Sequence, residues 1–144
     1  QLDWGLLGDQ RNQGIINWVA DINRVYREQP ALHEKDVQQG GFEWIDCCDT
    51  EASVLNYIRR GKSDPLGVVV VCNFTPVPRH NYHLGVPAGG YWREIANSDA
   101  VYYGGSGMGN LGGAETVPIA VHGRPHSLTV TLPPLAMLVW KHAS

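Results

Sequence analysis

Apolar residues follow two different spacings along this chain, and the change comes after Leu32. Between residues 13 and 29 they recur every three or four positions, which is the spacing of one face of an α-helix. Pro30 ends this predicted helix, and Asn12 is its expected N-cap. The face consists of Ile15, Trp18, Val19, Ile22 and Tyr26. Because so wide an apolar face has to be buried, we expect it to pack against a partner that need not belong to this chain.

After Leu32 the spacing indicates strands, and the best-marked strand lies between residues 67 and 78. Residues 68–71 are four consecutive valines, extended by Cys72. Such a short apolar run between turn residues is typical of a strand that is buried on both faces. Two prolines that follow lack the N–H a sheet ladder requires, so pairing should stop near Thr75. This strand needs neighbours on both sides and cover on both faces.

Alternating apolar and polar residues predict about seven further strands. They cover residues 42–47, 52–60, 81–86, 91–96, 115–121, 127–132 and 135–140. Pro118 interrupts one of these runs, so that strand is expected at an edge of the sheet. The glycine-rich residues 97–113 are expected to form a loop. The predicted fold class is mainly β: an antiparallel β-sandwich preceded by one amphipathic helix.

Composition excludes several classes of function. A net charge of −3 and a pI near 6.0 give no electrostatic basis for binding nucleic acid or an anionic membrane. No apolar stretch approaches the ~20 residues that a membrane helix needs. Cys47, Cys48 and Cys72 lack metal-ligand spacing, so we expect reduced thiols in a cytosolic protein rather than a disulfide or a zinc site. Because the chain opens on Gln rather than Met, we expect it to be a piece of a longer protein.

No motif in the chain predicts a self-contained active site. Residues 107–112 spell G-x-G-x-x-G, but no helical pattern follows, so a glycine loop is a better interpretation than a dinucleotide site. His80 and His83 would lie on opposite faces of a strand. His122 and His126 flank a turn and are expected to satisfy loop backbone groups. We therefore expect no catalytic residue, no bound metal and no cofactor.

Five aromatic residues crowd the short span between positions 82 and 103. Flat aromatic faces suit stacking on sugar rings. Tyr82 and Trp92 are better explained as core residues, whereas Tyr102 and Tyr103 stand beside two glycines and are expected to be exposed. Tyr102 and Tyr103 are therefore the candidate carbohydrate-binding residues.

A set of short segments, taken in order, runs through essentially the whole chain. The segments are residues 2–4, 6–7, 21–24, 30–34, 41–45, 53–55, 72–79, 92–95, 97–99, 103–106, 122–124 and 127–136. The most specific is 72–79, Cys-Asn-Phe-Thr-Pro-Val-Pro-Arg. Together they resemble the C-terminal end of bacterial 1,4-α-glucan branching enzymes, which belong to the α-amylase superfamily.

The resemblance implies that the chain has two parts. In that family a (β/α)₈ barrel is followed by an all-β C-terminal domain. Residues 1–34 would be the end of the barrel domain, including its last helix, and residues 35–144 would be the C-terminal β-sandwich. The family's nucleophilic Asp, general-acid Glu and transition-state Asp lie in barrel segments that precede Gln1. This chain alone is therefore expected to have no activity.

The resemblance also implies a function and partners for the parent protein. The parent would be a glycosyltransferase of glycogen biosynthesis in the bacterial cytoplasm, which cleaves an α-1,4 glucan and transfers the chain to a 6-hydroxyl. The expected partners of this chain are the missing catalytic barrel and an α-glucan such as glycogen or amylose, with neither nucleic acid nor membrane. The helix at 13–29 would also allow the chain to self-associate.

Two other interpretations of the chain stay open beside this one. It could be a free-standing carbohydrate-binding module that uses exposed aromatic residues, or a structural interaction domain without a ligand. The helix discriminates among them, because an independent module has no reason to carry it.

Overall fold

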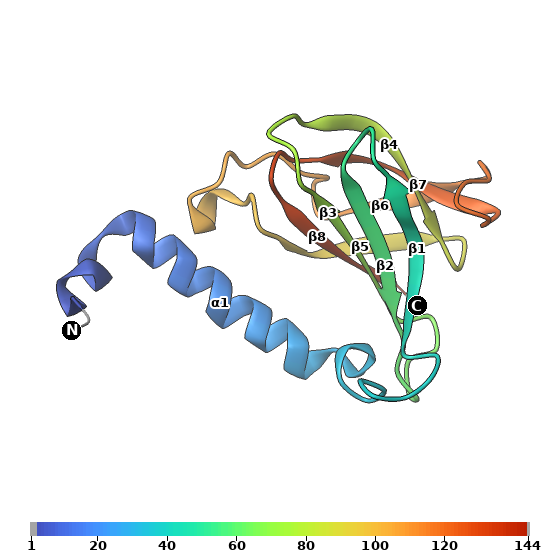
Figure 1. Cartoon of the computed structure of the whole chain (residues 1–144), viewed down its shortest axis with the longest axis horizontal. Coiled ribbons are helices and arrows are strands. Elements are labelled where there is room, and N and C mark those ends of the chain that lie inside the picture. The colour runs from blue at the N-terminus through green and yellow to red at the C-terminus, as the bar shows by residue number, and fades with distance from the viewer. Residues whose placement is uncertain (1–2, 144) are drawn as a thin grey trace.

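The computed structural model describes residues 3–143, and it shows one long helix beside a domain of β-strands (Figure 1). The helical elements are η1 (Trp4–Gly8), α1 (Gln10–Glu28), η2 (Pro30–Leu32) and η3 (Val101–Tyr103). The strands are β1 (Phe42–Asp49), β2 (Val54–Arg59), β3 (Val68–Asn73), β4 (Arg79–Val86), β5 (Tyr91–Asn97), β6 (Gly113–Val117), β7 (His126–Leu132) and β8 (Met137–His142). The predicted fold class, mainly β with one helix ahead of it, is confirmed.

Helix α1 begins three residues earlier than the sequence predicted. Its N-cap is Asp9, whose carboxylate accepts a hydrogen bond from the backbone N–H of Arg11 at 2.8 Å. Asn12 lies inside the first turn, where its side chain donates to the carbonyl of Leu6 at 2.9 Å. The N-cap prediction was wrong because Asp9 and Asn12 are both good caps, and η1 decides which of them is used. The predicted end before Pro30 is confirmed.

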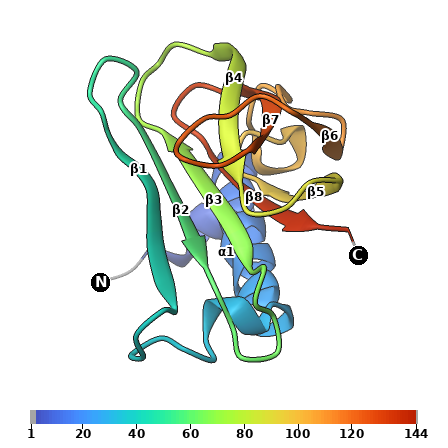
Figure 2. The ribbon, with the colours of Figure 1, turned by 90° about the vertical axis from the view of Figure 1, so that its right-hand side faces the viewer.

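The eight strands pair antiparallel in one continuous sheet with the order β1-β2-β3-β8-β5-β6-β7-β4. This sheet folds over on itself, so that β4 and β7 cover the face of β2, β3 and β8 (Figure 2). Asn56 on β2 donates to the hydroxyl of Tyr82 on β4 at 2.8 Å and so links the two layers. The core between the layers consists of Val54, Ile58, Val69, Val71, Leu84, Val86, Trp92, Leu128, Val130, Leu132, Leu138 and Trp140.

Strand β3 is the central strand that the sequence predicted. It pairs with β2 on one side and β8 on the other, and its valines are buried on both faces. Val69 and Val71 lie in the core between the layers, while Val68 and Val70 pack on the opposite face with Ala31 of η2. The four-valine run is thus explained by cover on both sides of one strand.

The expected edge position of the strand near residue 118 was wrong. Strand β6 pairs with both β5 and β7, and the sheet edges are β1 and β4. Pro118 stands just beyond the last residue of β6, so it ends the strand and leaves the ladder intact.

Helix α1 presents one narrow face to the β-domain and leaves most of its predicted apolar face uncovered. Within the helix only Gly14 and Val25 are buried. Ile15, Val19 and Tyr26 of the predicted face are 63%, 48% and 45% exposed. Among the described residues, no helix has the length and apolar character that crossing a membrane requires.

Candidate functional site

The two predicted carbohydrate-contact residues lie together on η3, between the end of β5 and the glycine loop. Tyr102 is 66% exposed, as expected. Tyr103 is only half-exposed, because its hydroxyl donates to Asp21 Oδ2 of α1 at 2.7 Å and its ring meets that of Trp18 edge-on, 5.1 Å between centroids. The expected exposure of Tyr103 was therefore wrong, because Trp18 and Asp21, which are far away in the sequence, cover it.

This contact between η3 and α1 shifts the pKa values of Asp21 and Tyr103 in opposite directions. The hydrogen bond from Tyr103, together with one from Arg24, holds the pKa of Asp21 below its usual value. Burial and the neighbouring Asp21 carboxylate raise the pKa of Tyr103 to about 12. Tyr103 thus keeps its proton at neutral pH and donates it to a carboxylate that stays charged.

A glycine on α1 makes room for the contact. A Cβ at Gly14 of α1 would lie 2.3 Å from the carbonyl oxygen of Tyr103, so only glycine lets the two backbones approach this closely. Behind η3, the Asp99 carboxylate accepts hydrogen bonds from the backbone N–H of Ser106 and Met108, at 3.0 and 3.3 Å, and so folds the glycine loop back on itself.

The predicted glycine loop, rather than a dinucleotide site, is what the structure contains. Residues 107–112 lead directly into β6, so no helix follows them. Glu94 of β5 lies beneath this loop and accepts hydrogen bonds from Asn110 and Asn97 at 2.7 and 3.3 Å. Burial raises the pKa of this carboxyl. Oε2 of Glu94 binds Asn110 of the loop, and Oε1 binds Asn97 at the end of β5.

A second aromatic surface lies on β1 and β2 and was missed by the sequence reasoning. Phe42 stacks on Tyr57 with 5.3 Å between ring centroids, and Trp44 meets Phe42 edge-on at 4.9 Å. Phe42 and Trp44 are 45% and 49% exposed. We call these three residues the β1–β2 aromatic cluster. Its signal in the sequence is a pair of aromatic residues two positions apart, which lie on one face of a strand.

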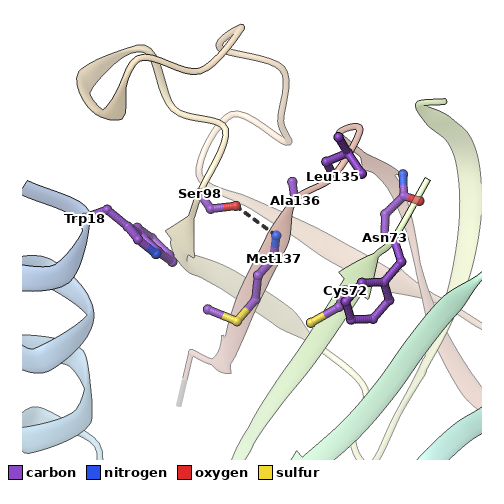
Figure 3. A pocket seen from close by; sticks show the side chains of 8 residues that line it. Trp18, Cys72, Asn73, Ser98, Leu135, Ala136 and Met137 are labelled. Carbon is purple, nitrogen blue, oxygen red and sulfur yellow. Dashed lines mark hydrogen bonds between the residues drawn. The ribbon is translucent and has the colours of Figure 1, made fainter. Parts of the chain in front are cut away.

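A groove of about 460 Å³ separates α1 from the ends of β3 and β8 (Figure 3). Its lining residues are Trp18, Cys72, Asn73, Phe74, Ser98, Leu135, Ala136 and Met137. Ser98 Oγ accepts a hydrogen bond from the backbone N–H of Met137 at 2.9 Å, which ties the start of β8 to the end of β5. The lining is mostly apolar, so the groove suits packing better than acid–base chemistry.

The remaining candidate groups have structural roles. His122 Nδ1 accepts a hydrogen bond from the backbone N–H of Gly85 at 3.2 Å. Because Gly85 lies in β4, the backbone group that His122 satisfies belongs to a strand and not, as had been predicted, to a loop. The predicted core position of Trp92 is confirmed, and Tyr82 is partly buried against the same core. Across residues 3–143, no group of three or more histidine, cysteine and acidic side chains could hold a metal ion.

Comparisons with known proteins identify the domain. The family model for the α-amylase C-terminal all-β domain matches residues 44–143. A 1,4-α-glucan branching enzyme GlgB of Aromatoleum aromaticum is 56% identical over 96% of this chain and 22% of its own length. The GlgB enzymes of Aquifex aeolicus and Synechococcus elongatus are 55% and 51% identical over 98% and 99% of the chain. The chain spans only about a fifth of the length of these curated relatives, 22% and 18% for the last two.

Proposed function

Since this chain belongs to the family of α-amylase C-terminal all-β domains, we propose that it is the C-terminal part of a 1,4-α-glucan branching enzyme. In this proposal the whole protein is a cytoplasmic glycosyltransferase of glycogen biosynthesis. It cleaves an α-1,4 glucan and transfers the released segment to a 6-hydroxyl. The chain described here supports the catalytic barrel and contacts glucan, and carries out no chemistry.

The observation that carries the proposal is the extent of the similarity to branching enzymes. The family model begins at residue 44, whereas the GlgB relatives match 96% or more of the chain. Only one residue follows position 143, so the additional matched residues lie ahead of residue 44. The helix is therefore shared with these enzymes along with the β-domain.

Residues 1–34 are proposed to be the end of the catalytic barrel domain and residues 35–144 the C-terminal β-domain. The uncovered apolar side chains of η1 and α1 support this division, because they need a partner. These side chains are Trp4, Leu6, Leu7, Ile15, Ile16, Val19 and Tyr26. The missing barrel is the proposed partner, and self-association through the same face is the alternative.

Residues 30–34 contact the sandwich closely, although they fall on the barrel side of this boundary. Ala31 is fully buried against the outer face of β3, and Leu32 accepts a hydrogen bond from Arg59 of β2 at 3.2 Å. The Glu34 carboxylate accepts hydrogen bonds from the backbone N–H and the hydroxyl of Ser63, both at 2.9 Å. The segment after Pro30 thus joins the two parts.

Four of the acidic side chains are held in ion pairs, which fits a chain without catalysis of its own. A retaining transferase needs two carboxyls about 5 Å apart across the scissile bond. Here Asp21, Asp36, Glu43 and Asp64 each pair with an arginine or lysine. A carboxylate neutralised in this way is a poor nucleophile or proton donor.

Two exposed aromatic surfaces support contact with glucan: Tyr102 on η3 and the β1–β2 aromatic cluster. We propose that Tyr102 stacks on a glucose ring, with Tyr103 holding η3 in place against α1. The β1–β2 aromatic cluster is a second candidate surface. It is also the observation that favours a carbohydrate-binding module as the alternative function.

Affinity electrophoresis through gels with and without glycogen, beside an iodine-stain branching assay, tests this function. We expect the chain to be retarded by glycogen and to show no branching. Replacing Tyr102 or Trp44 by alanine should weaken retardation about 2- to 10-fold, since an aromatic contact contributes roughly 0.5–1.5 kcal/mol. Leu111→Ala is the matched control, because Leu111 is fully exposed on the same glycine loop.

The two assays test different parts of the proposal: gel retardation tests contact with glucan, and iodine staining tests catalysis. Absence of retardation would contradict glucan contact and leave a scaffold that supports the barrel. Branching by this chain alone would contradict the assignment of catalysis to the missing barrel.

A further inference from the structure

Cys47 and Cys48 lie side by side in β1, the strand that forms one edge of the sheet. In a regular strand successive side chains point to opposite faces, which would keep two adjacent sulfurs apart. Here the sulfurs are 3.5 Å apart, and both cysteines are exposed.

A β-bulge causes this arrangement. Between Asp46 and Asp49 strand β1 advances three residues, while its partner β2 advances two, from Asn56 to Val54. The additional residue breaks the alternation at the two cysteines. The backbone N–H of Cys48 donates to Asp46 Oδ1 at 2.8 Å, which holds the bulge in place.

A direct disulfide between the two sulfurs is unfavourable. Neighbouring Cα atoms across a trans peptide are about 3.8 Å apart, below the roughly 4.4–6.8 Å at which disulfides form without strain. A single atom bonded to both sulfurs would link them without the strain of a direct disulfide. With bonds of about 2.3 Å to each sulfur, the observed spacing corresponds to an S–X–S angle near 100° at that atom.

We propose that Cys47 and Cys48 form a chelating dithiol that binds one soft, thiol-seeking ion, and that trivalent arsenic fits its geometry. Thiolate sulfur selects soft ions over hard ones. Trivalent arsenic is pyramidal, so it accepts two sulfurs at an angle near 100°. Because β1 has a strand neighbour on one side only, the dithiol is open to an approaching reagent.

The binding reaction is a condensation without oxidation or reduction. An aryl arsenic(III) oxide, R–As=O, takes up the two thiols and forms two As–S bonds, while both thiol protons leave with the oxide oxygen as water. Arsenic stays trivalent and the sulfurs stay at their original oxidation state.

Cys72 provides an internal control within the same chain. It lies on β3 in the groove beside α1, partly buried, and burial raises the pKa of its thiol. A single thiol binds the same reagent through one sulfur only. Joining two ligands in one chain typically strengthens binding by a factor on the order of 100 or more.

The test is mass spectrometry of the chain with phenylarsine oxide, followed by a challenge with excess monothiol. We expect one phenylarsenic group on the wild type and on Cys72→Ser, retained through the challenge. Cys47→Ser and Cys48→Ser should each lose the group and bind at least about 100-fold more weakly. Circular dichroism checks that each variant is folded. The proposal is overturned if the wild type retains no arsenic, or if either of these two variants retains it as firmly as Cys72→Ser.

Discussion

The β-sandwich and the helix that precedes it bury their apolar side chains to very different extents. Ile58 of β2 is fully buried between the layers, whereas Ile15 of α1 is 63% exposed. The two layers of the sandwich cover each other, so the domain supplies its own core. The helix contacts that domain through one narrow face and exposes the other. This difference fits the proposal that α1 is one half of an interface with the missing barrel domain.

The contacts between the helix and the β-sandwich are also confined to a few residues. The helix meets η3 through Gly14, Trp18 and Asp21, and η2 anchors its C-terminal end through Ala31. Between these anchors lies the groove of about 460 Å³. The attachment is thus specific but small, which suits a helix held between two domains.

The largest expected difference is in the free energy of unfolding, when an isoleucine is replaced by alanine in the sandwich or in the helix. Ile58→Ala should destabilise the chain by roughly 2–5 kcal/mol, because it leaves a cavity in a closed core. Ile15→Ala should change the free energy of unfolding by less than about 0.5 kcal/mol, since its side chain is exposed. Urea unfolding of the two variants measures both values. A large loss with Ile15→Ala would show that this face is covered, for example by a second copy of the chain.

A smaller effect is expected where the helix meets η3. Gly14→Ala places a methyl group against the Tyr103 carbonyl and should weaken the attachment of α1 by roughly 1–3 kcal/mol, the usual cost of overpacking. Gly8→Ala is the control, because a Cβ there meets nothing within 4 Å. Near-UV circular dichroism, to which the packed rings of Trp18 and Tyr103 contribute, follows the change. Equal signals from the two variants would contradict the close approach.

The smallest expected effect is the pH dependence of the same contact. Asp21 has a lowered pKa, so its contribution is present above its unfolded pKa and is lost as pH falls through the folded one. Tyr103 has a raised pKa, so its contribution is present below pH 10 and is lost as pH rises toward about 12. Thermal unfolding of the wild type and Tyr103→Phe across both ranges measures the difference. If the two curves run parallel at all pH values, the hydrogen bond contributes no measurable stability.

The sequence predicted those features of the fold that depend on local spacing. The valines of β3 and the alternation in β7 identified buried strands because burial on one or both faces leaves a direct pattern. Pro118 was interpreted wrongly, since its effect depends on whether the strand extends to it. The choice of Asp9 over Asn12 as N-cap required knowledge of η1.

The candidate site was predicted less well, because exposure depends on residues distant in sequence. Tyr102 and Tyr103 are adjacent and look equivalent, yet Asp21 and Trp18 cover only the second. Phe42 and Trp44 looked like an ordinary strand face. They are exposed because β1 lies at an edge, and the sequence alone does not reveal the strand order.

Urea unfolding of residues 30–144 compared with the whole chain tests most directly whether the sandwich is self-sufficient. This truncation removes η1 and α1 but keeps Ala31 and Glu34, which contact the sandwich. We expect the shorter chain to unfold in one cooperative transition at a similar urea midpoint and to be more soluble, because the exposed helix face is gone. A shorter chain that is unfolded or aggregated without urea would contradict the account, and α1 would then belong to the β-domain itself.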